Sequence, residues 1–128
     1  MQVCDGMSSV VLTIGPDHTL SEAARLMAAR NVGAAVVVDP ESPGLGIVTE
    51  RDILRSLANG EEPKSERVGD HLTENLISAS PNWSLEQAAD TMVQHGFRHL
   101  LVVDGGELSG VLSMRDIVRC WVSTGVVG

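Results

Sequence analysis

The chain has 128 residues, of which 43% are hydrophobic, and its formal net charge is −8 at pH 7. This length is that of one ordinary domain, and a hydrophobic fraction this high excludes a disordered chain. The acidic charge argues against a nucleic-acid partner, because binding to phosphate backbones requires basic patches.

The first half of the chain predicts five elements in the order strand, helix, strand, strand, helix. In the first helix, Leu20, Ala23, Ala24 and Met27 follow the spacing i, i+3, i+4, i+7, which predicts one apolar face. Thr19 precedes that helix by one residue and has capping-box spacing to Glu22. The expected positions are Val10–Ile14, a helix from Leu20, Ala34–Val38, Leu45–Thr49 and a helix from near Arg51.

The second half repeats this order 64 to 65 positions later, and its first helix starts with a capping-box pair, Ser84 and Gln87. A fixed period of this kind indicates one supersecondary unit used twice. The sequence therefore predicts an α/β (α+β) protein of two β-α-β-β-α repeats. The expected positions are Leu76–Ala79, a helix from Leu85, His99–Val103, Glu107–Ser113 and a helix from near Arg115.

Four segments follow from the repeat. We expect the first repeat at residues 1–58, a linker at 59–67, the second repeat at 68–122 and a flexible tail at 123–128. The part of the linker from Asn59 to Ser65 contains few apolar residues and several helix breakers, so we expect the charges there to be solvated. Because each repeat is too small for a large core of its own, we expect the two to share one core.

The candidate chemistry lies where a strand gives way to a helix. Thr49 with Asp52, and Ser113 with Asp116, stand at this junction in the two repeats. A hydroxyl there can bond to phosphate, and a carboxylate can accept hydrogen bonds from two vicinal sugar hydroxyls. The same spacing is also that of a capping box, which is a purely structural alternative. The hydroxyl, Arg and Asp recur together behind a Gly, which favours binding, but both alternatives stay open.

The two heptapeptides that contain these pairs, Gly46–Asp52 and Gly110–Asp116, resemble the motif of CBS domains. These modules are named after cystathionine β-synthase, and a tandem pair is called a Bateman module. The resemblance covers nearly the whole chain. It implies a pseudo-twofold pair of repeats with two clefts between them, each lined crosswise, for adenine nucleotides or related adenosyl ligands.

The resemblance also implies which residues line each cleft. Arg98 offers forked donors suited to phosphate, and His99 adds positive charge below about pH 6.5. Gly33 and Ala34 offer no polar side-chain atoms, so we expect unequal occupancy. The first cleft is expected to contain Ile47, Thr49 and Asp52 with Asn75, Leu76, Arg98 and His99, and the second Val111, Ser113 and Asp116 with Ser8, Val10, Gly33 and Ala34.

The implied function is that of a stand-alone regulatory sensor. It would bind AMP, ADP, ATP or S-adenosylmethionine as a regulatory ligand, need no other cofactor, and signal by conformational change to an unidentified protein target in trans. The alternative is a non-catalytic dimerisation module with vestigial clefts, since similar proteins commonly form homodimers. No Ser-His-Asp order or carboxylate pair points to an enzyme.

The remaining signals predict an ordinary soluble protein. Cys4 and Cys120 are expected to be reduced and partly buried thiols. His18, His71 and His95 show no mutual ligand spacing, so no metal site is predicted. Signal-peptide features and apolar runs near the ~18 residues that span a bilayer are missing from the sequence. We therefore expect a cytoplasmic location and no membrane partner.

Overall fold

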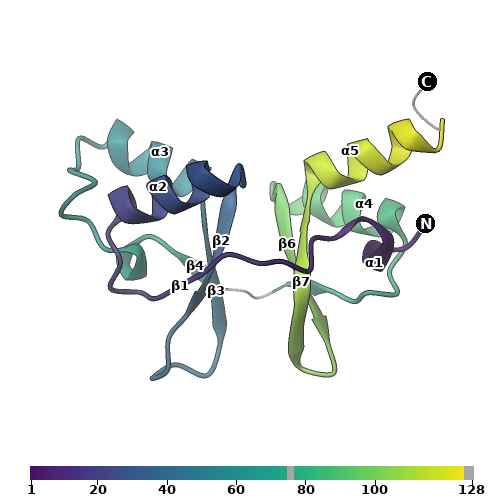
Figure 1. Ribbon diagram of the computed structural model, residues 1–128, viewed down its shortest axis with the longest axis horizontal. Helices are drawn as coiled ribbons and strands as arrows, with labels where there is room; N and C mark the ends of the chain where they lie inside the picture. The colour runs from purple at the N-terminus through teal and green to yellow at the C-terminus, as the bar shows by residue number, and fades with distance from the viewer. Residues whose placement is uncertain (75–76, 126–128) are drawn as a thin grey trace. The chain divides into compact units, whose positions relative to one another are not determined.

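The computed structural model describes residues 1–74 and 77–125 (Figure 1). Asn75 and Leu76 of the predicted site, and residues 126–128 of the predicted tail, lie outside the described residues. The chain divides into two compact units. One unit consists of Val11–Asn75, and the other combines Met1–Val10 with Leu76–Gly128. Within the described ranges, every helix is too short or too polar to cross a membrane.

The unit Val11–Asn75 is a four-stranded sheet with helices on one side of it (Figure 1). The sheet order is β1-β2-β3-β4, in which β1 runs parallel to β2 and the other pairs are antiparallel. The elements in chain order are β1 (Thr13–Ile14), α2 (Leu20–Arg30), β2 (Ala34–Val38), β3 (Leu45–Thr49), α3 (Glu50–Ala58), the 3-10 helix η1 (Val68–Asp70) and β4 (Thr73–Glu74).

The second unit contains a three-stranded sheet with the order β5-β6-β7. Strand β5 is parallel to β6, and β6 forms an antiparallel hairpin with β7. Here too the longer helices lie on one side of the sheet (Figure 1). The elements are α1 (Val3–Gly6), β5 (Ser78–Ala79), α4 (Leu85–His95), β6 (His99–Asp104), β7 (Glu107–Ser113) and α5 (Met114–Ser123).

The predicted order β-α-β-β-α is confirmed in both repeats. The predicted first strands are too long, since β1 and β5 contain two residues each. Val10, at the start of the predicted strand, is 79% exposed and lies outside β1. Three short elements, α1, η1 and β4, were not predicted, because four residues or fewer are too short to show a hydrophobic period.

Each unit has its own cluster of buried side chains. The predicted apolar faces are correct, because Leu20, Ala23 and Met27 of α2 are buried in one cluster. Met92 of α4 is buried in the other, against which Trp83 also packs. Each cluster forms within one unit, because the helices of that unit cover the apolar face of its sheet. The prediction that the two repeats share one core concerns both units together, so it stays a prediction.

The first ten residues join the second unit through backbone hydrogen bonds. The amide of Val3 donates to the carbonyl of Trp83 over 2.8 Å. Ser8 and Val111 exchange two hydrogen bonds of 2.9 and 3.0 Å, which adds a short antiparallel bridge beside β7. These bonds explain why the compact units cut across the two sequence repeats.

The two predicted capping boxes differ in the structure. Thr19 accepts from the amide of Glu22, and the Glu22 carboxylate accepts from the amide of Thr19, so the box before α2 is complete. Before α4, the hydroxyl of Ser84 accepts from the amide of Gln87 over 3.0 Å. Among the described contacts the return bond with the Gln87 side chain is missing, so the predicted capping box is only half formed before α4.

Candidate functional site

Thr49 and Asp52 form a complete capping box at the start of α3. The Asp52 Oδ2 atom accepts from the Thr49 amide over 2.8 Å and from the Thr49 hydroxyl over 3.1 Å. The hydroxyl accepts in turn from the Asp52 amide over 3.4 Å. Both residues are half-buried, and the box leaves the second carboxylate oxygen, Oδ1, outside it. The structural alternative from the sequence is therefore confirmed here.

Ser113 and Asp116 form the corresponding box at the start of α5. The Asp116 Oδ2 atom accepts from the Ser113 amide over 2.9 Å, and the Ser113 hydroxyl accepts from the Asp116 amide over 3.0 Å. The second oxygen of Asp116 has a further partner, because Nη1 of Arg119 lies 3.0 Å from Oδ1. The same guanidinium donates to the Gly6 carbonyl over 3.4 Å. The two carboxylates thus differ in whether the second oxygen, Oδ1, is already paired with an arginine.

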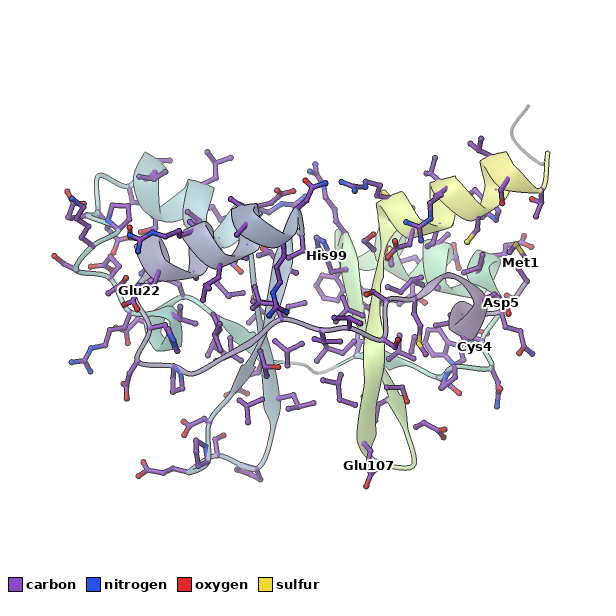
Figure 2. The ribbon with its side chains drawn as sticks, viewed as in Figure 1. Met1, Cys4, Asp5, Glu22, His99 and Glu107 are labelled. Carbon is purple, nitrogen blue, oxygen red and sulfur yellow. The ribbon has the colours of Figure 1, made fainter. Side chains whose placement is uncertain are left out.

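Strand register places further predicted residues beside each box. Ala34 of β2 pairs with Thr49 of β3, and the Glu50 amide donates to the Gly33 carbonyl over 2.9 Å. In the other unit His99 of β6 pairs with Ser113 of β7. Figure 2 shows His99 at the end of the hairpin opposite Glu107.

Polar chemistry differs between these neighbourhoods. His99 is half-buried, whereas Arg98 is exposed and its carbonyl accepts from the Met114 amide over 2.8 Å. Gly33 and Ala34, at the corresponding positions of the other unit, carry no charge. Arg98 and His99 therefore bring their basic side chains to the strand end that precedes α5.

The remaining described site residues lie on the strands or close to them. Ile47 and Val111 are half-buried in β3 and β7. Ser8 is bridged to Val111, and its hydroxyl donates to the Val10 carbonyl over 3.0 Å. Within each unit the structure thus gathers the motif residues at one strand end. We also predict that each cleft is lined by the motif of one repeat and by residues of the other. Because this concerns both units together, it stays a prediction.

Sequence reasoning missed two groups of side chains. Arg119 follows Asp116 by three residues, a helical spacing that brings the two side chains together. In the predicted linker, Glu66 accepts a hydrogen bond from His71 over 2.8 Å. The expectation of solvated charges covers Asn59 to Ser65, and it is wrong for Glu61, which is partly buried with its Oε2 atom 3.9 Å from Nε2 of His71. No sequence signal marked this contact, because the segment is irregular.

The two cysteines are both free thiols. Cys4 is exposed, and Cys120 is buried in the cluster that contains Met92. The expectation of partly buried thiols is therefore wrong for Cys4, which is exposed, whereas Cys120 is buried.

Comparison with known proteins identifies the repeats. A model of the CBS domain matches residues 2–59 and 68–123. The CBS domain-containing protein YhcV of Bacillus subtilis is 40% identical over 116 residues, which are 90% of this chain and 81% of that protein. The chain spans less than two thirds of several other curated relatives.

Two solved structures share the fold. A hexameric CBS-CP12 protein from bloom-forming cyanobacteria has a TM-score of 0.87 and 29% identity, with 96% of this chain and 74% of that chain covered. A CBS domain pair solved in complex with 5-methylthioadenosine and S-adenosyl-L-methionine has a TM-score of 0.84 and 25% identity, with 97% and 98% covered. Since the family model matches most of its length in two copies, this chain belongs to the CBS domain family.

Proposed function

We propose that this chain is a regulatory module that binds an adenine nucleotide or another adenosyl ligand and signals by conformational change to a protein target in trans. The observation that carries the proposal is the carboxylate of Asp52. Its Oδ2 atom completes a capping box, and its Oδ1 atom lies outside the box at a half-buried helix start. A carboxylate placed in this way can accept hydrogen bonds from ribose hydroxyls.

The start of α3, where the hydroxyl of Thr49 lies, also suits the phosphate end of a nucleotide. Helix α3 begins one residue after Thr49, and the N-terminus of a helix favours a negatively charged ligand. The structural relative solved with S-adenosyl-L-methionine and 5-methylthioadenosine supports an adenosyl ligand for this fold. The binding would be regulatory, because a ligand that prefers one conformation shifts the population toward it.

Asp52 is the better ribose acceptor of the two motif aspartates. The Oδ1 atom of Asp116 is already paired with Arg119, so a ribose would compete with a guanidinium there. We therefore infer that the motif in the first repeat is the principal site. We propose that the basic pair Arg98 and His99 assists phosphate binding, as the resemblance implies. The cytoplasmic location of the protein stays a prediction.

The decisive experiment has two steps. Mass spectrometry of the purified protein first identifies any ligand it retains. Thermal unfolding is then measured with AMP, ADP, ATP and S-adenosylmethionine, where a ligand at 100 times its Kd stabilises the fold by about 2.7 kcal/mol. We expect one of these compounds to raise the unfolding midpoint by several degrees, and Asp52→Ala to remove most of that rise.

Two controls separate ligand binding from helix capping. Asp52→Asn keeps an acceptor oxygen for the Thr49 amide but removes the charge, so the ligand-induced rise is compared with each variant's own unliganded midpoint. Asp90→Ala removes a carboxylate on α4 whose described hydrogen bond is to Gln94. If none of the four compounds shifts the midpoint, or if Asp52→Ala and Asp90→Ala respond alike, the proposal is refuted.

A second candidate function, self-association, is favoured by exposed apolar side chains on two helices. Leu54 and Leu57 of α3 are 65% and 51% exposed, and Val118 and Val122 of α5 are 47% and 57% exposed. Apolar groups that recur along one helix face mark interaction surfaces more often than scattered ones do. We propose that these faces serve a homodimer of the chain.

The molar mass of the protein in solution tests this second function. Light scattering coupled to size exclusion should give a dimer for the wild type, and Leu57→Glu or Val118→Glu should shift the mass toward the monomer. Asp52→Ala and Asp116→Ala should leave the mass unchanged. A monomer for the wild-type chain contradicts this proposal.

A further inference from the structure

Three side chains with metal-binding chemistry converge in the segment between α3 and β4. Glu61, Glu66 and His71 each contribute one donor atom, and these atoms all lie within 4.8 Å of one another. The His71 Nε2 atom lies 2.8 Å from Oε1 of Glu66 and 3.9 Å from Oε2 of Glu61. All three side chains are partly buried, with His71 17% exposed.

The backbone that carries these side chains is held in place by hydrogen bonds to its neighbours. The Glu61 amide donates to the Ser56 carbonyl over 3.1 Å, which fixes the chain just after α3. The Leu20 amide donates to the Glu66 carbonyl over 2.9 Å, at the start of α2. His71 follows η1, and its amide donates to the Val68 carbonyl over 3.0 Å. The cluster is therefore built on an ordered backbone.

A positive group between the two carboxylates would stabilise this cluster. Two carboxylates this close repel each other unless a proton or a cation is shared. His71 can satisfy only one of the two carboxylates. Its Nε2 atom makes a single hydrogen bond, which it forms with Glu66, whereas Oε2 of Glu61 lies 3.9 Å from Nε2.

We propose that Glu61, Glu66 and His71 bind a divalent transition-metal ion, for which Zn²⁺ fits best. An ion bound by imidazole nitrogen and carboxylate oxygen at about 2.0–2.2 Å in tetrahedral geometry holds its ligand atoms about 3.3 Å apart. The separations of 2.8 and 3.9 Å from Nε2 lie on either side of that value. One nitrogen and two oxygens match zinc, and the fourth position is left for water.

This site is independent of the nucleotide proposal. Thr49 and Asp52 lie at the first turn of α3, whereas Glu61 follows the other end of that helix. A metal here would cross-link the segment after α3 to the residue that follows η1. Its expected effect is therefore on the stability of the unit Val11–Asn75, whether or not an adenosyl ligand binds.

The test is isothermal titration of the full chain with ZnCl₂ at pH 7.5, after treatment with EDTA and its removal. We expect one zinc ion per chain and a rise in the unfolding midpoint. Glu66→Gln and His71→Ala should each weaken the zinc affinity at least tenfold. Because the amide oxygen introduced by Glu66→Gln can still accept from His71, this variant removes charge while it keeps the hydrogen bond.

Matched controls come from the same segment and the same residue types. Glu62→Gln removes an exposed carboxylate whose described bond is to the Lys64 amide, and His95→Ala removes an exposed imidazole on α4. Both should bind zinc as the wild type does. The proposal is overturned if Glu66→Gln and His71→Ala bind zinc as tightly as the wild type does. It is also overturned if the wild type neither binds zinc nor is stabilised by it. Either result would show that the cluster is only an ion pair of His71 with glutamate.

Discussion

The guanidinium of Arg119 lies 3.0 Å from the second carboxylate oxygen of Asp116, the oxygen that the capping box of α5 does not use. The first repeat has Arg55 at the corresponding helix position, and Asp52 has no salt bridge among the described residues. The two motifs therefore share one backbone geometry but differ in electrostatics. This difference gives the first testable prediction.

Arg119→Ala should cost little stability and should make Asp116 a better acceptor. Because the Arg119 side chain is 62% exposed, its ion pair contributes less than about 1 kcal/mol to the free energy of unfolding. The stabilisation by an adenosyl ligand should increase in this variant, since the ribose no longer competes with the guanidinium. Urea unfolding with and without the ligand measures both quantities. Arg115→Ala, an exposed residue of the same helix, is the control, and an equal ligand response in the two variants would count against the competition.

Glu22 predicts a dependence of stability on pH. Hydrogen bonds from the backbone and then the side chain of Thr19 lower the pKa of Glu22 from its ordinary value of 4.5. A lowered pKa in the folded state means that its contribution is complete above pH 4.5 and is lost as the pH falls through the lower folded value. Glu22→Gln should therefore be less stable than wild type at pH 7, and the difference should shrink by pH 3.

Urea midpoints at the two pH values test this prediction. Gln87 occupies the corresponding position of α4, so Gln87→Glu is the reciprocal variant and should gain stability at pH 7 but not at pH 3. A gap between wild type and Glu22→Gln that stays constant with pH would exclude the carboxylate as its source.

The regular parts of this fold could be predicted because they carry a period. The apolar stripe of α2 and the capping spacing of Thr19 and Glu22 identify one helix start, and the repeat identifies the next. The capping boxes at Thr49 and Ser113 also follow from spacing alone. The ligand does not, because a hydroxyl and a carboxylate at a helix start serve capping and binding equally well.

Contacts between irregular segments could not be predicted in the same way. Glu61, Glu66 and His71 follow one another at intervals of five residues, a spacing that matches neither a helix face nor a strand face. Their approach depends on the path of the backbone around η1. Likewise, the bridge from Ser8 to Val111 joins residues more than a hundred positions apart. Local patterns contain no information about such pairs.

Ser56 offers a substitution that should not destabilise the fold. It is 1% exposed, and within the described residues its hydroxyl oxygen has no hydrogen-bond partner. Burial of an unsatisfied hydroxyl costs about 1–3 kcal/mol, so Ser56→Ala should leave stability unchanged or raise it. Ser84→Ala is the contrast, because it removes the cap of α4 and should cost about 0.5–2 kcal/mol. Equal losses in the two variants would show that Ser56 has a partner in solution.

Gly110 permits a close approach of the N-terminal segment to β7. A Cβ at this position would lie 2.5 Å from the carbonyl oxygen of Ser8 and 3.0 Å from the sulfur of Met7. The first neighbour is backbone, so Gly110→Ala should push the segment away and weaken the two hydrogen bonds between Ser8 and Val111. Overpacking of this kind costs about 1–3 kcal/mol.

Amide exchange and urea unfolding together test this role of Gly110. In Gly110→Ala the amides of Ser8 and Val111, which bond to each other's carbonyls, should exchange faster, and the urea midpoint should fall. Gly44→Ala is the matched control, because a Cβ there meets nothing within 4 Å. A Gly110→Ala protein with unchanged exchange at Ser8 would mean that the first ten residues are not anchored to the second repeat through this bridge. The compact unit would then have to depend on other bonds, such as the one between Val3 and Trp83.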